Sequence, residues 1–380
     1  MNAPRLEIDL GKISHNARTL LALMSARGIS VTGVTKAVLG SPDISNALLG
    51  AGVNAIGDSR IENIQAMRLA GVVAPMTLIR TPMLDQAVAV VAAADWSFNT
   101  ELDVISALST AARNAATTHG VLLMIELGDL REGIMPDDVE ATVRETIRMP
   151  NIAFVGIGTN LACRSGVTPD ARNMAELSVL ADRIDAAFGP VVKVVSGGNS
   201  ANIPWALSGA DTGRINNLRL GEAVLLGREP LARQQIDGLH VDAIRLVAQV
   251  IEAKDKPTMP VGRLGQSAFG DVDVGTDRGH IWQTILAIGR QDIDPDGIHP
   301  PQGFDVLAAG SDHLIVGSRE RRTRVGAEIA FQVNYSALVR AMTSPFVAKV
   351  YQSESKPRSA LPGSRGTPAD RMAKAAGQGV

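Results

Sequence analysis

Between residues 31 and 220 the sequence alternates short apolar runs with longer segments of helical periodicity, and this rhythm constrains the fold more than any other feature. Eight runs are apolar enough to be buried strands: 31–36, 55–58, 76–80, 95–99, 121–127, 153–159, 191–196 and 215–220. Segments such as 101–118, 137–148 and 170–187 have the length of helices. Eight βα units that close on themselves form a (β/α)8 barrel. An open doubly wound sheet is the competing arrangement, but the number of units and the weak Gly-x-Gly-x-x-Gly signal favour the barrel.

After about residue 235 the pattern changes to short strands separated by Gly, Pro and Asp, at 240–252, 281–288, 305–309, 313–316, 328–333 and 347–352. This spacing predicts a smaller all-β domain. Residues 5–10 alternate apolar and polar, as a half-buried strand does. We therefore expect a barrel over residues 11–234, a C-terminal β domain over 235–352 that includes the strand 5–10, and a disordered tail over 353–380.

Composition argues against several classes of function. The formal net charge is −2, so no electrostatic footprint for nucleic acid or an anionic membrane is expected. The single cysteine, Cys163, rules out an intramolecular disulfide, and the six histidines lack the spacing of metal ligands. The chain has no signal-peptide core and no apolar run of roughly 18 residues, so a cytoplasmic enzyme without a metal is the default expectation.

Lys36 ends the first barrel strand, at the edge where α/β enzymes place their chemistry. Burial lowers the pKa of an amine, which would make Lys36 a Schiff-base nucleophile or a general base, although a lysine that extends into solvent is an equal alternative. In a closed barrel the eighth strand lies beside the first, so Arg219 is expected next to Lys36. The loop 196–200, with its glycines, Asn199 and Ser200, suits a phosphate group. A lysine beside a phosphate site is the combination that pyridoxal 5′-phosphate (PLP) requires.

Arg131 and Asn160 follow the fifth and sixth strands and should lie on the same rim. Each has a structural alternative, such as an ion pair of Arg131 with Glu132 or Asp129, or a loop cap by Asn160.

Eight sequence blocks, in order and at sensible spacing, resemble the alanine racemase-like, fold type III PLP enzymes, and within them the ornithine racemase branch. They are GVTK at 33–36, GDSRIEN at 57–63, GDLREG at 128–133, GTNL at 158–161, SGGNS at 196–200, LRLGE at 218–222, AIGRQD at 287–292 and SDH at 311–313. The resemblance covers about residues 5–352. It implies a PLP-dependent racemase that acts on ornithine or another non-alanine amino acid. It also implies a homodimer in which the β domain of one subunit covers the barrel of the other.

The resemblance assigns roles to single residues. Lys36 would form the Schiff base and act as the base on one face of the substrate. Arg219 would donate to the pyridine nitrogen and Arg131 would steady the cofactor phenolate, while Asn160 takes the place of a ring-packing histidine. The phosphate would be held by Ser200 and the main chain near Gly221 and Glu222, and Asn199 is also predicted to bind the cofactor.

The second base is less defined, because alanine racemases use a tyrosine from the partner's β domain. Tyr335 and Tyr351 fall late in the β domain, in segments that we interpret as structural, and Thr343 and Ser344 are hydroxyl donors that could replace the family's phosphate-binding tyrosine. Asp312 and Ser267 are the predicted rim candidates, with Asp271 near the latter. A non-catalytic PLP carrier, or a PLP-dependent lyase or epimerase, stays an alternative function.

Overall fold

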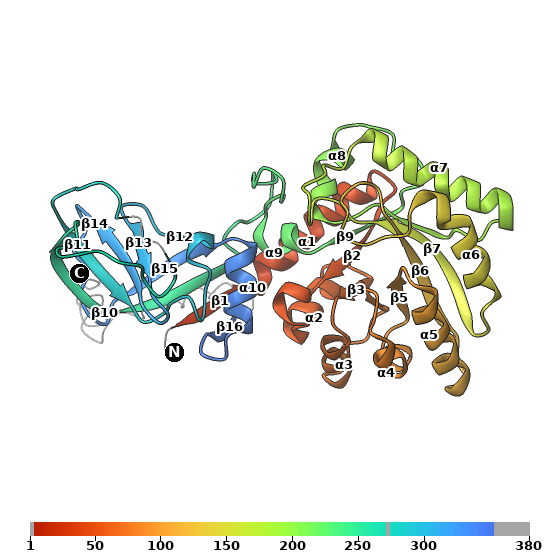
Figure 1. Cartoon of the computed structure of the whole chain (residues 1–380), viewed down its shortest axis with the longest axis horizontal. Helices are drawn as coiled ribbons and strands as arrows, with labels where there is room; N and C mark the ends of the chain where they lie inside the picture. The colour runs from red at the N-terminus through yellow and green to blue at the C-terminus, as the bar shows by residue number, and fades with distance from the viewer. Residues whose placement is uncertain (1–3, 271–273, 353–380) are drawn as a thin grey trace, which may run out of the picture.

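The computed structural model describes residues 4–270 and 274–352 and contains a closed barrel of eight parallel strands in sequence order (Figure 1). The barrel strands are β2 (Ser30–Val34), β3 (Ala55–Asp58), β4 (Met76–Leu78), β5 (Trp96–Asn99), β6 (His119–Ile125), β7 (Ile152–Thr159), β8 (Val194–Ser196) and β9 (Asn217–Leu220). Pairing of β2 with β9, with Val31 opposite Leu218, closes the ring. The predicted (β/α)8 barrel is confirmed.

Helices surround the barrel because each carries one apolar face toward the strands. They are α1 (Leu10–Ser25), α2 (Pro42–Gly50), α3 (Ile61–Leu69), α4 (Ala87–Ala93), α5 (Leu102–Asn114), α6 (Val139–Arg148), α7 (Ala171–Phe188), α8 (Ile203–Leu207) and α9 (Glu222–Leu226). In α1 the Asp9 side chain accepts from the Lys12 amide and starts the helix, and Ile13, Leu20 and Met24 are fully buried on one face.

The first barrel strand ends earlier than predicted, at Val34 rather than Lys36. The Thr35 amide still pairs with Gly57 O, but the chain then turns, and the Gly40 amide returns to Thr35 O at 3.2 Å. Leu39 adopts a left-handed conformation (φ 53°) to complete this turn. Lys36 therefore opens a short 3₁₀ helix, Lys36–Val38, just beyond the barrel strand.

The rest of the chain forms an antiparallel sheet in the order β12-β15-β10-β11-β14-β13. β1 joins this sheet rather than the barrel: it pairs antiparallel with β10 and parallel with β16. The elements are β1 (Arg5–Asp9), β10 (Ile244–Pro257), β11 (His280–Leu286), β12 (Ile298–His299), β13 (Asp305–Ala309), β14 (Leu314–Ser318), β15 (Glu328–Val333), α10 (Tyr335–Thr343) and β16 (Ala348–Gln352). The tail predicted over 353–380 and Asp271 lie outside the described residues.

The helix α10 was not predicted, since only strands were expected after residue 235. The Asn334 side chain accepts a hydrogen bond from the Ala337 amide at 3.0 Å and starts the helix. Leu338 and Ala341, on the inner face of the helix, are fully buried. α10 packs against the 3₁₀ helix Lys36–Val38. Through this contact a segment of the β region reaches the carboxyl-terminal face of the barrel.

Candidate active site

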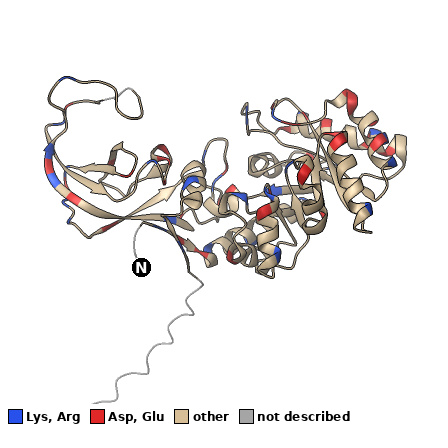
Figure 2. Ribbon diagram, turned by 60° about the horizontal axis from the view of Figure 1, so that its bottom comes forward, with Lys and Arg blue, Asp and Glu red and all other residues tan. Residues whose placement is uncertain are grey.

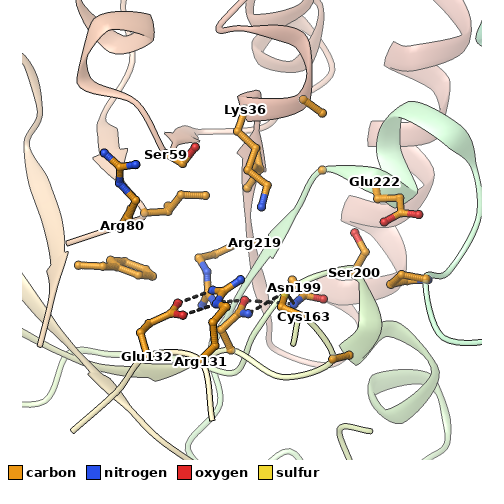
Figure 3. Close-up of a pocket in the computed structure, with 18 of the residues that line it drawn as sticks. Lys36, Ser59, Arg80, Arg131, Glu132, Cys163, Asn199, Ser200, Arg219 and Glu222 are labelled. Carbon is orange, nitrogen blue, oxygen red and sulfur yellow. Dashed lines mark hydrogen bonds and ion pairs between the residues drawn. The ribbon is translucent and has the colours of Figure 1, made fainter. Parts of the chain in front are cut away.

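A cavity of about 710 Å³ opens at the carboxyl-terminal ends of the barrel strands, the end at which this fold carries its active sites (Figure 3). All the residues predicted to bind a cofactor line it: Lys36, Arg131, Asn160, Asn199, Ser200, Arg219, Gly221 and Glu222. The cavity thus collects side chains that lie far apart in the sequence. Which of them bind a cofactor stays a prediction.

Lys36 projects into the middle of this cavity (Figure 3). Its Nζ makes no hydrogen bond to any residue that the structure describes, and it lies 6.0 Å from the centre of the Tyr335 ring. Burial lowers the pKa of the Lys36 amine; Cys163 and Asp58 oppose this change, and the positive charges of Arg131 and Arg219 support it. The amine is therefore neutral more often than a surface lysine, as a nucleophile or base must be.

Asp58 supports the strand end next to Lys36. It is fully buried, and its carboxylate accepts hydrogen bonds from Thr35 Oγ1 at 2.8 Å, the Arg60 amide at 3.0 Å and Asn63 Nδ2 at 3.0 Å. Burial raises the pKa of Asp58, although these donors oppose the change. The carboxylate thus ties β2 to the start of α3 and fixes the backbone from which Lys36 extends.

Arg219 is the most buried cation of the cavity, with 5% of its surface exposed. Its Nη1 donates to Ser196 Oγ at 2.6 Å, and its Nη2 donates to Thr159 O at 2.8 Å and Asn160 Oδ1 at 3.2 Å. The guanidinium also lies 5.0 Å from the centre of the Phe98 ring. Among the described residues no carboxylate forms an ion pair with it, and burial lowers the pKa of Arg219 to about 10. It remains charged at neutral pH, and its Nε has no partner in the described part of the chain.

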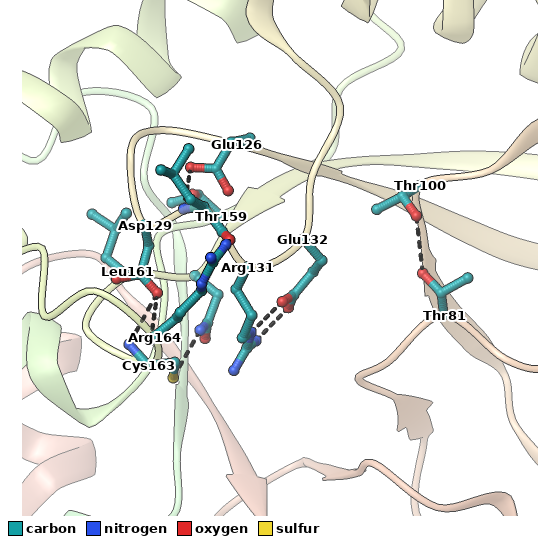
Figure 4. A network of polar contacts seen from close by, with 12 residues as sticks. Thr81, Thr100, Glu126, Asp129, Arg131, Glu132, Thr159, Leu161, Cys163 and Arg164 are labelled. Atoms are coloured by element: carbon teal, nitrogen blue, oxygen red, sulfur yellow. Dashed lines mark hydrogen bonds and ion pairs between the residues drawn. The ribbon is translucent and has the colours of Figure 1, made fainter.

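Arg131 lies in the loop after β6 and donates through Nε and Nη2 to both oxygens of Glu132. Of the two predicted partners of Arg131, the structure therefore selects Glu132. Asp129 is used differently: its buried carboxylate accepts the amides of Cys163 and Arg164, at 3.1 and 2.8 Å, so that the loop after β6 is fastened to the loop after β7 (Figure 4). This network holds Arg131 and Asn160 on one rim.

The opposite side of the cavity is formed by the loops after β8 and β9. The Ser200 side chain is buried, and its Oγ accepts from the Ala223 amide at 3.2 Å. Asn199 Nδ2 donates to Asn160 Oδ1 at 3.1 Å and Leu161 O at 2.9 Å, so Asn199 ties two loops together. A side chain at Gly221 would place its Cβ 3.0 Å from Val34 O, which explains the glycine.

Glu222 lines the same side, and Arg233 Nη1 donates to its carboxylate at 2.5 Å. Burial raises the pKa of Glu222, and the ion pair with Arg233 opposes this. The acidic side chain is thereby neutralised near the place where an anionic group is expected.

Tyr335, whose segment was interpreted as structural, lines the cavity. It is the first residue of α10, and burial raises the pKa of its phenol to about 12. The signal for this helix was present in the sequence: Asn334 is a good N-cap, and the apolar residues that follow have helical spacing. By contrast, Tyr351 accepts a hydrogen bond from Ser41 and does not line the cavity.

Four other predicted side chains lie elsewhere. Thr343 Oγ1 donates to carbonyls of its own helix, and Ser344 Oγ donates to Asp292, so neither replaces a phosphate donor in this cavity. Ser267 Oγ donates to Gly270 O at 3.0 Å within an exposed turn. Asp312 is exposed and accepts from its neighbour His313 at 2.8 Å, a hydrogen bond that lowers the pKa of the carboxyl. Neither lines the cavity of its own chain, and their role in a dimer stays a prediction.

Residues 4–270 and 274–352 show neither a metal-binding cluster nor a membrane-spanning helix. They contain no group of three or more His, Cys, Asp or Glu side chains placed to hold a metal ion. In the same part of the chain no helix has both the length and the apolar character to cross a membrane.

Comparison with known proteins gives consistent matches. Residues 8–229 match the family model described as alanine racemase, N-terminal domain. The chain is 37% identical over 351 residues to the lysine racemase of Thermotoga maritima, which covers 92% of this chain and 98% of that protein. It is also 37% identical over 350 residues to the ornithine racemase of Acetoanaerobium sticklandii, covering 91% of this chain and 99% of that protein. Among solved structures, alanine racemase from Streptomyces coelicolor A3(2) superimposes with a TM-score of 0.73 at 18% identity, over 91% of this chain and 97% of that one.

Proposed function

The chain belongs to the alanine racemase family, and from this we propose that it is a PLP-dependent amino-acid racemase, an isomerase that interconverts the two enantiomers of its substrate. The observation that carries the proposal is the meeting of Lys36, Arg219 and Ser200 in one cavity of suitable size. The match along nearly the whole length of two named racemases supports the same reaction class.

The donor set of the cavity fits PLP. Lys36 offers an amine of lowered pKa that has no hydrogen-bond partner among the described residues. Arg219 offers a buried guanidinium that lacks a carboxylate partner in that same set, and Ser200 offers a buried hydroxyl. We therefore assign the cofactor to Lys36, Arg219, Arg131, Ser200 and the main chain at 221–222. Asn160 and Asn199 join the two sides of this site through their mutual hydrogen bond.

When bound, PLP supplies an electron-withdrawing ring that stabilises negative charge on the carbon carrying the substrate amine. The protein's own residues supply the proton transfers. Lys36 Nζ accepts the proton from the substrate α-carbon on one face, for which its lowered pKa suits it. Arg219 would donate a hydrogen bond to the ring nitrogen and would keep its proton, because a pKa of about 10 is far above that of a pyridine.

The proton on the opposite face requires a second group, and we propose that it comes from the β domain of a second subunit. Asp312 and Ser267 are our candidates. The pKa of Asp312, lowered by the hydrogen bond from His313, makes this carboxylate a weak base on its own. The proposal therefore predicts a homodimer in which a neighbouring subunit covers the cavity.

For the substrate we propose a basic amino acid, such as ornithine or lysine, because the two relatives that match nearly the full chain are named for these substrates. A cytoplasmic location fits such a metabolic enzyme. Each substrate carries an α-carboxylate, and the cavity has an excess of arginines to receive it.

The test is α-proton exchange. The purified protein, loaded with PLP, is incubated in D₂O with a panel of L- and D-amino acids, and deuterium at the α-carbon and the enantiomeric ratio are measured. Wild type should exchange at least one basic amino acid, whereas Lys36→Ala should lose both exchange and the visible absorbance of the bound cofactor. Lys193→Ala, at an exposed lysine outside the cavity, is the matched control. Cofactor binding without exchange of any amino acid would favour a carrier, and cleavage of an amino acid would favour a lyase.

A further inference from the structure

Arg80 lines the cavity and is not among the residues proposed to bind the cofactor or to transfer a proton. It follows β4, two residues after the strand ends at Leu78. Its guanidinium makes no hydrogen bond or ion pair with any residue in the described ranges 4–270 and 274–352. An arginine at a cavity wall that is not bound to the protein is available for a ligand.

The other three arginines of the cavity are already bound to protein groups. Arg131 donates to both oxygens of Glu132, and Arg233 donates to Glu222. Arg219 donates to the Ser196 hydroxyl, the Thr159 carbonyl and the Asn160 side-chain oxygen. Both carboxylates that line the cavity are thus neutralised by arginines, and the positive charge of Arg80 is not balanced by a protein partner in the described part of the chain.

Arg80 also lies on the side of Lys36 away from the expected phosphate site. In the barrel order β8-β9-β2-β3-β4, the strands that precede Ser200 and Arg80 are each two places from β2, in opposite directions. Figure 3 shows the same arrangement, with Arg80 and Ser59 on one side of Lys36 and Ser200 and Glu222 on the other. A ligand that reaches Arg80 therefore extends from Lys36 away from the phosphate end.

The cavity wall near Arg80 contains apolar side chains, such as Ile79 and Phe98, and also offers further donors. Thr81 Oγ1 and Thr100 Oγ1 are 3.4 Å apart, and Ser59 has a hydroxyl without a hydrogen-bond partner among the described residues. A guanidinium with hydroxyl groups around it is the setting in which a carboxylate is bound by charge-assisted hydrogen bonds. The same setting repels an ammonium group.

We propose that Arg80 binds the α-carboxylate of the amino-acid substrate and so fixes which end of the substrate faces β4. This inference rests on the proposed racemase function, because it takes the reacting amine to be at Lys36. It assigns the distal ammonium of a basic substrate to a different part of the cavity. Arg80 is then a substrate-binding residue, distinct from the residues assigned to the cofactor.

The experiment measures binding of propionate, a carboxylate without an amine, to the PLP-loaded protein by isothermal titration. Arg80→Ala should weaken propionate binding by about 10- to 100-fold, the usual effect of removing a charge-assisted pair, and Arg80→Lys should weaken it less. Arg60→Ala, at an exposed neighbouring arginine outside the cavity, should bind as wild type does. Retained cofactor absorbance shows that each variant is folded and loaded.

Three outcomes would overturn the inference: equal propionate affinity in wild type and Arg80→Ala, no propionate binding by wild type, or a loss of cofactor from Arg80→Ala with propionate affinity unchanged. The kinetic counterpart is a higher KM of Arg80→Ala for the amino acid at nearly constant kcat. If wild type exchanges no amino acid but propionate binding still depends on Arg80, the racemase proposal fails and the carboxylate site stands.

Discussion

The buried histidine of the barrel provides a quantitative test of the structure through the pH dependence of stability. His119 begins β6 and has 1% of its surface exposed. Its Nε2 lies 2.8 Å from Ser97 Oγ, which also accepts from Asn99 Nδ2 at 3.0 Å. Burial lowers the pKa of His119 from 6.5 to about 4, despite an opposing contribution from Asp95. The folded protein therefore keeps this imidazole neutral over a pH range in which the unfolded chain protonates it.

The sign and size of the effect follow by linkage. Above pH 6.5 the imidazole is neutral in both states and contributes no pH dependence. Between pH 6.5 and about 4 the unfolded state binds a proton that the folded state does not, so the free energy of unfolding decreases as the pH falls. The full difference corresponds to about 3 kcal/mol, and between pH 7.5 and 5 the loss is about 2 kcal/mol.

The assay is urea unfolding of wild type and His119→Gln at pH 7.5 and 5, followed by circular dichroism. Glutamine keeps a polar amide near Ser97 but does not titrate, so the variant should lose about 2 kcal/mol less than wild type between the two pH values. His299→Gln, at an exposed histidine of β12, is the control and should follow wild type. If wild type and His119→Gln lose equal free energy between pH 7.5 and 5, the folded pKa is not depressed and the reasoning is refuted. Because His119 lies at the end of the barrel opposite the cavity, His119→Gln should keep its activity at pH 8.

Two further predictions concern backbone strain and the tyrosine of the cavity. Gly156 in β7 has a φ of 153°, and an added Cβ would lie 1.9 Å from Val194 O. Gly156→Ala should therefore lower the free energy of unfolding by more than about 3 kcal/mol in the same urea assay. Gly71 also has a positive φ but has open space around it, so the control Gly71→Ala should lower the free energy of unfolding by only about 1–2 kcal/mol. The pKa of Tyr335, raised to about 12 by burial, keeps its phenol protonated up to pH 10, so Tyr335→Phe should change the rate without shifting the pH at which activity changes; a moved profile would show that Tyr335 titrates in the working range.

The barrel was predictable because its strands are buried on both faces and are therefore short continuous apolar runs, separated by helices of regular length. Strand ends were less predictable, because hydrogen bonds of the following turn decide them. The run 76–80 was expected to be one strand, but β4 ends at Leu78 and leaves Arg80 in the loop that forms the cavity wall. Ile79 and Arg80, which were expected to end the strand, therefore lie in the loop and line the cavity.

The helix α10 shows a different limit of sequence reasoning. Its own signals, an Asn334 cap and apolar residues at helical spacing, are local and could have been recognised. Its position against the 3₁₀ helix Lys36–Val38 is a tertiary contact between segments about 300 residues apart, and local pattern does not encode such a contact. For this reason the sequence alone did not place Tyr335 at the cavity, whereas the structure does.

The charges of the cavity connect its two tasks, holding anions and keeping an amine neutral. Burial and the positive charges of Arg131 and Arg219 both lower the pKa of Lys36, and the same positive charges attract a phosphate or a carboxylate. These tasks oppose each other, because a bound anion close to Lys36 would raise the pKa of the amine and favour its protonated form. If the phosphate binds near Ser200 and the α-carboxylate near Arg80, on opposite sides of Lys36, the positive charge of Arg80 offsets the negative charge of the carboxylate, which is bonded to the carbon from which Lys36 takes the proton.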